Sequence, residues 1–255
     1  MSGPPDLVLV TGGASGSGAA AAEALTRAGM LPILADIASI APSHGDVIVW
    51  EQRFDIADEQ SVHAGIDEIE RRHGPLYGAV NAAGILGKMH TPERIKLENW
   101  DREMAVDLRG TFLVCREVGA RMARRGRGAI VNVASIAGMS SAPAHAYAAA
   151  KAGVIQMTAT LAAEWGRRGV RVNAVSPGFT RTPALEAGLA AGALKREDLT
   201  RQSAMGRLVE PGEVGEAIAW LIDPRSSGIT GVNVPVDAGF LAGMSWEAYG
   251  GFRAN

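Results

Sequence analysis

The chain has 255 residues, of which 47% are hydrophobic and 20% charged, and its formal net charge is -2. This composition supports a sizeable core and excludes a disordered chain. The weak charge gives no electrostatic basis for binding nucleic acid or an anionic membrane. The single cysteine, Cys115, excludes an intrachain disulfide and is compatible with a reducing cytoplasm, where we expect the protein. We find no signal peptide and no apolar stretch of the roughly 18 residues that a membrane helix needs.

Strand-like and helix-like stretches alternate along the chain. The predicted strands are short apolar runs: Leu7–Val10, Leu31–Ala35, Val47–Phe54, Tyr77–Asn81, Ala129–Val133, Val170–Ala174 and Val232–Val236. The predicted helices lie between them: Gly18–Ala28, Asp58–His73, Trp100–Arg125, Ala146–Arg168 and Glu213–Ile222. Apolar strands separated by helices indicate parallel strands that are buried on both faces. We therefore predict an α/β fold: one Rossmann-type, doubly wound domain over residues 1–255, with a seven-stranded parallel sheet and helices on both faces.

Two segments lack this alternation. Thr182–Gly206 mixes small, charged and glycine residues after a predicted strand, so we expect a lid over a substrate site. The tail, residues 241–255, contains Trp246, Tyr249 and Phe252, which are apolar enough to dock. We expect the tail to pack on a neighbouring subunit; unchanged assembly and kinetics after deletion of residues 244–255 would refute this.

The first predicted strand runs into a glycine-rich turn, "TGGASGSG", that opens a helix. Gly12, Gly16 and Gly18 permit positive φ angles and a close approach of the backbone to a phosphate. The helix N-terminus offers free N–H groups to a pyrophosphate. Directly after a first strand, these features indicate a dinucleotide site more strongly than an ordinary turn.

Asp36 ends the second predicted strand, at about the distance from these glycines at which an acid meets the hydroxyls of an adenine ribose. A carboxylate accepts hydrogen bonds from two hydroxyls and repels a 2′-phosphate. The turn contains no Arg or Lys that could bind such a phosphate. We therefore predict NAD rather than NADP; a solvated residue at the end of a strand is the alternative interpretation of Asp36.

The stretch "AYAAAK" places Tyr147 and Lys151 four residues apart, on one face of a predicted helix. A lysine cation near a phenol favours the phenolate, which allows the tyrosine to exchange protons near neutral pH. Upstream, Ser135 ends a predicted strand at the sheet edge where α/β proteins bind ligands, and its hydroxyl can donate to a carbonyl or accept from an alcohol. An isolated serine would more often cap a helix or turn, but the nearby Tyr–Lys pair favours a catalytic role.

Together with "NAAG" (residues 81–84) and "NAVSPGFTRT", these motifs resemble the short-chain dehydrogenase/reductase family from about Leu7 to Phe240. The resemblance implies hydride transfer between a nicotinamide cofactor and a secondary alcohol or ketone, catalysis by Ser135, Tyr147 and Lys151, and a homotetramer. It assigns the following residues to the cofactor: Gly12, Ser15, Gly16, Gly18, Asp36, Asp55, Ile56, Asn81, Ala82, Gly84, Tyr147, Lys151, Pro177, Gly178, Thr180 and Thr182.

Two features depart from the family pattern. Asp107, in "AVDLRG", stands where the family has an Asn that helps to hold a water between the lysine and solvent. An ionised Asp cannot donate hydrogen bonds and adds negative charge near Lys151. We therefore count Asp107 among the candidate catalytic residues, with an altered proton relay or a protonated carboxyl as the consequence and a tolerated helix residue as the alternative. The interval from Ser135 to Tyr147 is also one residue shorter than expected, which should reshape the substrate pocket.

The sequence therefore predicts an NAD-dependent oxidoreductase that interconverts a small-molecule secondary alcohol and a ketone, without a metal, nucleic-acid or membrane partner. Two alternatives stay open: an NADPH-dependent carbonyl reductase of the 3-oxoacyl type, and a non-catalytic nucleotide-sensing protein on the same fold. Small or cyclic alcohols, polyols and hydroxysteroids all remain possible substrates. We interpret His90 as a surface-loop residue and His145 as a helix-start residue.

Overall fold

The computed structural model describes residues 5–40, 47–50, 53–192 and 194–252, apart from the side chain of residue 247. It contains a seven-stranded sheet in the order β3-β2-β1-β4-β5-β6-β7, and all paired strands are parallel. The strands are β1 (Leu7–Thr11), β2 (Leu31–Ala35), β3 (Ile48–Val49), β4 (Leu76–Asn81), β5 (Gly128–Val133), β6 (Val170–Pro177) and β7 (Asn233–Val236). The predicted parallel, doubly wound sheet is confirmed, and its strand order reverses between β1 and β4, where such folds bind ligands.

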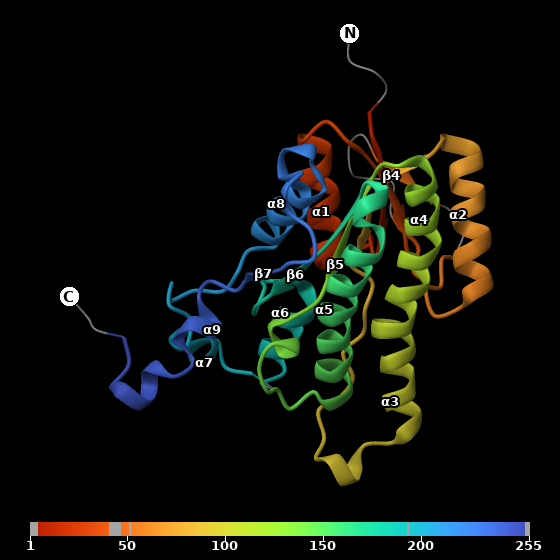
Figure 1. Ribbon diagram of the computed structural model, residues 1–255. Helices are drawn as coiled ribbons and strands as arrows, with labels where there is room; N and C mark the ends of the chain where they lie inside the picture. The colour runs from red at the N-terminus through yellow and green to blue at the C-terminus, as the bar shows by residue number, and fades with distance from the viewer. Residues whose placement is uncertain (1–4, 41–46, 51–52, 193, 253–255) are drawn as a thin grey trace.

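Helices cover both faces of the sheet (Figure 1). One layer consists of α1 (Gly16–Arg27) and α8 (Pro211–Ile222), and the other of α2 (Glu59–His73), α4 (Thr111–Arg125) and α5 (His145–Trp165). The shorter helices are α3 (Leu97–Glu103), α6 (Pro183–Ala190), α7 (Arg196–Arg201) and α9 (Phe240–Gly243). Single turns of 3-10 helix are η1 (Pro92–Arg94), η3 (Ile136–Gly138), η4 (Gly166–Arg168), η5 (Pro224–Ser226) and η6 (Trp246–Tyr249).

The two helical layers explain why most strand residues are apolar. Successive side chains of a strand point to opposite faces. In β1, Leu7 and Leu9 pack into the core beneath α2, α4 and α5, whereas Val8 and Val10 pack into the core beneath α1 and α8. Because both faces are buried, both sets of positions in β1 are apolar from Leu7 to Val10.

The third predicted strand, Val47–Phe54, is wrong in length. Within its described part only Ile48 and Val49 pair with β2, and residues 51–52 lie outside the described residues. Beyond Val49, the amides of Trp50 and Phe54 donate to the carbonyl oxygens of Leu34 and Asp36 at 2.8 and 2.9 Å. The side chains of Trp50 and Phe54 lie in the core, where they are 6% and 2% exposed. Burial of these two large rings, and not strand pairing, accounts for the apolar character of the segment.

The long helix predicted over Trp100–Arg125 is interrupted. It consists of α3, a π-helical turn η2 (Met104–Gly110) and α4. Such turns accommodate one extra residue per turn and occur often at functional sites. The predicted helix Ala146–Arg168 corresponds to α5 and the 3-10 turn η4.

The predicted lid and tail carry short helices. In its described part, Thr182–Gly206 contains α6 and α7 and no strand; residue 193 lies outside that part. The tail contains α9 and η6, extends away from the sheet in Figure 1, and stacks Trp246 on Phe252 with 5.3 Å between ring centroids. Residues 253–255 lie outside the described part, and the contact of the tail with another subunit stays a prediction.

Small residues set the spacing between α4 and α5. A Cβ atom at Gly119 of α4 would overlap the ring of Trp165 of α5. A Cβ atom at Gly153 of α5 would lie 3.0 Å from Cδ1 of Leu108 in η2. The absence of side chains at these positions lets the two helices approach closely, and this approach fixes the side chains that both helices project toward the carboxyl edge of the sheet.

We expect Gly119→Ala to destabilise the protein, because the added methyl group must displace the Trp165 ring. The expected loss is about 1–3 kcal/mol, even though alanine has the higher helix propensity. The matched control is Gly166→Ala: Gly166 has a φ of -55°, and a Cβ atom there would meet nothing within 4 Å. Denaturant midpoints of the two variants measure the difference. Equal midpoints would contradict the proposed close packing.

Candidate active site

The glycine-rich turn joins β1 to α1 at the carboxyl edge of the sheet. Gly12 and Gly16 have φ angles of 69° and 57°, which favour glycine. A Cβ atom at Gly12 would lie 2.6 Å from the amide nitrogen of Ala83, and one at Gly18 would overlap the carbonyl oxygen of Gly12. The turn therefore packs tightly against the end of β4 and requires glycine at these positions.

The N-terminus of α1 is free to receive an anion. Ser15 precedes the helix in an extended conformation, and its side chain forms no capping hydrogen bond. A Cβ atom at Gly16 would meet only the methyl group of Thr182, at 3.7 Å, so the start of α6 lies next to the turn. An uncapped helix N-terminus with this little side chain around it fits the pyrophosphate of a dinucleotide.

Asp36 is held at the end of β2 by the same turn. One carboxylate oxygen accepts a hydrogen bond from the Ala14 amide at 3.1 Å, and the other accepts one from the Ala38 amide at 3.0 Å. A carboxylate has about four acceptor positions, so each oxygen keeps capacity for a hydroxyl. Asp36 is partly buried and fixed in orientation, which fits recognition of a ribose diol.

Ser135, Tyr147 and Lys151 come together around the end of β5 and the start of α5. Lys151 is 4% exposed, and its Nζ donates to the carbonyl oxygen of Val133 at 3.0 Å. The same Nζ lies 5.4 Å from the centroid of the Tyr147 ring. Ser135 follows β5, and its Oγ accepts from the Ala137 amide at 3.2 Å, so the serine also caps η3. The cap leaves the hydroxyl hydrogen available to a substrate.

A buried polar network positions α5 on the sheet. Asn81 of β4 donates to Oδ1 of Asn132 of β5 at 2.8 Å, and Asn132 donates to Oγ1 of Thr158 of α5 at 2.9 Å. Asn132 and Thr158 were not among the residues predicted from the sequence, although an asparagine within an apolar strand is a usable signal. The side chain of Asn81 faces this network, which supports a structural contribution to the cofactor site.

Asp107 lies in η2 and is fully buried, with an exposure of 0%. Its Oδ1 accepts from the Ile85 amide at 2.8 Å, whereas Oδ2 has no partner among the described residues. A Cβ atom at Gly84 would lie 2.7 Å from this Oδ1 and 3.3 Å from Nζ of Lys151, so the two side chains converge on Gly84. Burial raises the pKa of Asp107 to about 6, although the Lys151 cation and the Ile85 amide oppose the shift.

The remaining residues predicted for the cofactor have local partners. Asp55 pairs with Arg53 at 2.9 Å, and Ile56 is buried against Gly110. Thr180 donates to the Gly178 carbonyl at 3.1 Å, and Thr182 caps α6. Ala82 and Gly84 follow β4, whereas Pro177 ends β6 and Gly178 follows it. These placements leave their cofactor contacts as predictions.

Cys115 is a core residue. It is completely buried, and burial raises the pKa of its thiol to about 12, so it stays protonated at neutral pH. Among the described residues, no group of three or more His, Cys, Asp or Glu side chains could hold a metal ion. No helix in the same part of the chain is long and apolar enough to span a membrane.

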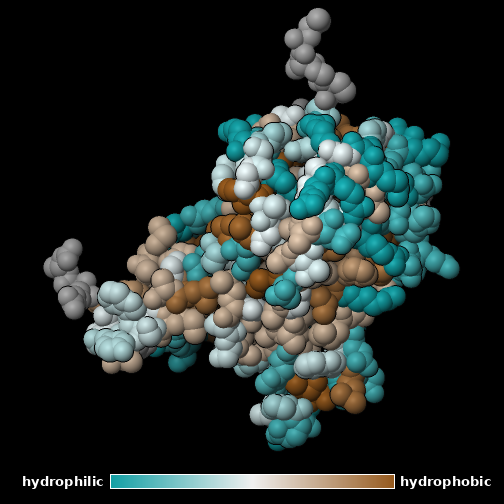
Figure 2. Space-filling view, viewed as in Figure 1, coloured by the Kyte–Doolittle hydropathy of each residue, from teal (hydrophilic) through white to brown (hydrophobic). Residues whose placement is uncertain are grey.

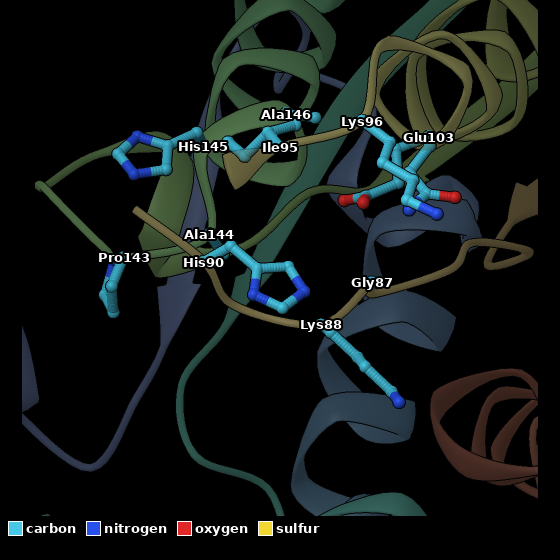
Figure 3. A pocket seen from close by; sticks show the side chains of 11 residues that line it. Gly87, Lys88, His90, Ile95, Lys96, Glu103, Pro143, Ala144, His145 and Ala146 are labelled. Carbon is cyan, nitrogen blue, oxygen red and sulfur yellow. The ribbon is translucent and has the colours of Figure 1, made fainter. Parts of the chain in front are cut away.

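A polar pocket lies between the segment that leads from β4 into α3 and the start of α5 (Figure 3). It is lined by Gly87, Lys88, His90, Ile95, Lys96, Asn99, Glu103, Pro143, Ala144, His145 and Ala146. His145 starts α5, as predicted, and both histidines belong to the lining. No local sequence pattern indicates Glu103, because its place in the pocket depends on the path of the β4–α3 segment.

Comparisons with known proteins identify the family of this chain. A family model described as Enoyl-(Acyl carrier protein) reductase matches residues 12–241. The D-threitol dehydrogenase of Mycolicibacterium smegmatis is 37% identical over 243 residues, which are 92% of this chain and 92% of that protein. The chain belongs to the short-chain dehydrogenase/reductase family.

Two solved structures resemble the short-chain dehydrogenase fold of this chain. A crystal structure described as ribose-5-phosphate isomerase from Brucella melitensis 16M is 46% identical, has a TM-score of 0.93, and covers 99% of this chain and 98% of its own. An actinorhodin polyketide ketoreductase with NADPH is 28% identical, has a TM-score of 0.85, and covers 94% of this chain and 99% of its own. Family membership makes the chain an oxidoreductase that uses a nicotinamide cofactor.

We expect Asp107→Asn to change how stability depends on pH. A carboxyl whose folded pKa is raised from 3.8 to about 6 binds its proton more tightly in the folded state, so its contribution to stability is lost as the pH rises through this window. Over the whole titration, the contribution of Asp107 to the free energy of unfolding falls by roughly 3 kcal/mol. About half of this decrease occurs between pH 5 and 7.5. The variant should therefore gain stability relative to the parent over that range, measured by urea unfolding at several pH values. Asp101→Asn, at an exposed position of α3, is the control. Parallel curves for the parent and Asp107→Asn would contradict the shifted pKa.

Proposed function

We propose that this short-chain dehydrogenase oxidises a secondary alcohol to a ketone, and catalyses the reverse reaction, with NAD as the hydride carrier. The observation that carries the proposal is the convergence of Ser135, Tyr147 and the buried Lys151 at one end of α5. A phenol, an aliphatic hydroxyl and an ammonium group supply a proton-exchanging group, a hydrogen-bond donor and a fixed positive charge. The glycine-rich turn and Asp36 provide a matching dinucleotide cradle at the same edge of the sheet.

The side chains divide the proton chemistry between them. In alcohol oxidation, the Tyr147 phenolate accepts the hydroxyl proton, and in ketone reduction the Tyr147 phenol returns it to the carbonyl oxygen. Ser135 donates a hydrogen bond to the same substrate oxygen and orients it. Lys151, which the Val133 carbonyl holds in place, favours negative charge on the phenol by Coulomb attraction. When bound, the nicotinamide cofactor supplies the hydride chemistry.

Lys151 has the carboxyl group of Asp107 nearby, at the position where the family pattern has an asparagine. A carboxyl near the lysine can carry a proton itself, since its pKa of about 6 lies within the working range of an enzyme. We therefore assign Asp107 to the proton path behind Lys151, as a group that acts through the lysine and does not touch the substrate.

NAD is favoured over NADP by the charge at Asp36. The carboxylate would lie against the 2′-phosphate of NADP, whereas it can accept hydrogen bonds from the two free hydroxyls of NAD. Its two backbone partners fix the carboxylate in place, so it cannot easily turn away from a phosphate.

Three other functions compete with this proposal. The 46% identity to a protein described as ribose-5-phosphate isomerase favours a sugar phosphate isomerase, which would need no net oxidation or reduction. The description of the matching family model favours a reductase of acyl carrier substrates. A non-catalytic nucleotide-sensing protein is the third. The paired Tyr147 and Lys151 beside a dinucleotide cradle favour the dehydrogenase, because hydride transfer uses all of these parts.

A homotetramer in the cytoplasm completes the proposal. Figure 2 shows a hydrophilic surface over α2 and a more apolar one over α5. Exposed large apolar side chains include Phe112 of α4 and Trp220 of α8. The docking of further copies of the chain would bury such exposed apolar side chains. Light scattering of the full chain tests the assembly, and a monomer would contradict it.

Tyr147→Phe should lose nearly all turnover, at least about 10³-fold, while it still binds NADH, because the substitution removes only the proton-exchanging hydroxyl group. The assay follows NADH absorbance with a panel of secondary alcohols and ketones, and cofactor binding is measured by NADH fluorescence. Ribose 5-phosphate is included, and ketose formation without a change in NADH would favour the isomerase. Normal turnover by Tyr147→Phe would refute the mechanism.

Asp36→Ser should narrow the preference for NAD over NADP. Loss of a charged hydrogen-bond acceptor weakens NAD use by roughly 10–100-fold, and loss of the negative charge improves NADP use. The measurement is kcat/KM for both nucleotides with one alcohol, and Glu23→Gln, at an exposed position of α1, is the control. Equal use of both nucleotides by the parent would contradict the assignment of Asp36.

A further inference from the structure

We infer that the polar pocket beside the start of α5 selects a polyhydroxylated substrate, and that Glu103 is the hydrogen-bond acceptor that recognises its additional hydroxyl groups. This inference rests on the proposed function, because it places the distal part of an alcohol next to Tyr147. The pocket includes Ala144, His145 and Ala146, the residues that directly precede the tyrosine.

The first observation is a buried acid without a partner. Glu103 is 9% exposed, yet in the part of the chain that the structure describes its side chain forms no hydrogen bond or ion pair. Its Oε1 packs against the Cα atom of Gly87, where any Cβ atom would overlap it. Neither carboxylate oxygen is fully enclosed, so both remain accessible from the pocket. A ligand that donates hydrogen bonds can therefore reach this carboxylate.

The second observation is the direction in which this acid points. In Figure 3 the Glu103 side chain extends from its helix toward the side where His90 and His145 lie, whereas Lys88 points away from it. Both histidines line the same pocket, as does Asn99. The acid is therefore directed into a lined space and not into the packed core.

The lining selects among ligand classes. A carboxylate or phosphate would meet the charge of Glu103 as well as the opposite charges of Lys88 and Lys96. A steroid or acyl chain would bury the acid without a hydrogen-bond donor. An ammonium group would face Lys96, which lines the same pocket. Hydroxyl groups both donate and accept, so they satisfy Glu103, Asn99 and the imidazoles together. Polyols and sugars carry such groups next to a secondary alcohol.

Glu103 and Asp107 face different surroundings. Glu103 and Asp107 lie four positions apart, at the end of α3 and in η2, and the charge of Glu103 contributes to raising the pKa of Asp107. Asp107 faces Lys151 across Gly84, whereas Glu103 faces the pocket beside Gly87. One acid therefore belongs to the proton path and the other to substrate recognition.

The test compares alcohols of four carbons with increasing numbers of hydroxyls: 2-butanol, 2,3-butanediol and threitol. We expect kcat/KM of the parent with NAD to rise along the series, with threitol preferred over 2-butanol by roughly 10–100-fold, the range of one or two charge-assisted hydrogen bonds. Glu103→Met, which keeps the volume and removes the acceptor, should lose most of this preference. Glu98→Gln, at an exposed position of the same helix, should keep it.

A binding measurement covers the case in which Glu103→Met turns over poorly. In the Tyr147→Phe background with NAD bound, threitol should raise the thermal midpoint, and the added Glu103→Met substitution should abolish this shift. Equal kcat/KM for 2-butanol and threitol would overturn the inference and leave the dehydrogenase proposal standing. Failure of the parent to oxidise any alcohol of the series or of the wider panel would overturn both. An unchanged preference in Glu103→Met would also overturn the inference, because another residue would then recognise the hydroxyls.

Discussion

The buried cation of Lys151 is the constraint on which the arrangement of this site depends. An ammonium group that is 4% exposed must have hydrogen-bond partners, because its transfer from water is otherwise too costly. The Val133 carbonyl at the end of β5 is one such partner, at 3.0 Å. This bond fixes the height of α5 against the sheet, and the contact between Asn132 and Thr158 fixes the same helix two turns further on. Tyr147 is positioned as a consequence.

The site also requires that α4 and α5 lie close together, and small residues allow this. Ala146 and Ala150 are buried on α5, and Gly119 of α4 accommodates the Trp165 ring. Side chains of ordinary size at these positions would separate the helices and move Asp107 away from Lys151. The alanine-rich sequence around the tyrosine is therefore explained by packing distance, although Ala149 is exposed and remains available to a partner.

The segment before α4 contains two buried acids, Glu103 and Asp107. The π-helical turn η2 holds Asp107 behind Lys151, and the preceding turn holds Glu103 at the polar pocket. In most positions a buried acid is costly, and here two lie one turn apart. Proteins keep such arrangements where the chemistry uses them, so we propose that this segment links the proton path to the recognition of substrate.

The sequence by itself determined the parallel sheet, the glycine-rich turn, the end of β2 at Asp36 and the pairing of Tyr147 with Lys151. All of these depend on short-range spacing, which periodicity and helix geometry convert directly into positions. Only the tertiary structure decided the early end of β3, the interruption at η2, the network through Asn132 and the place of Glu103 in a pocket. These features arise where segments distant in sequence meet, since the burial of Trp50 and Phe54 and the path from β4 to α3 depend on neighbours that no local pattern specifies.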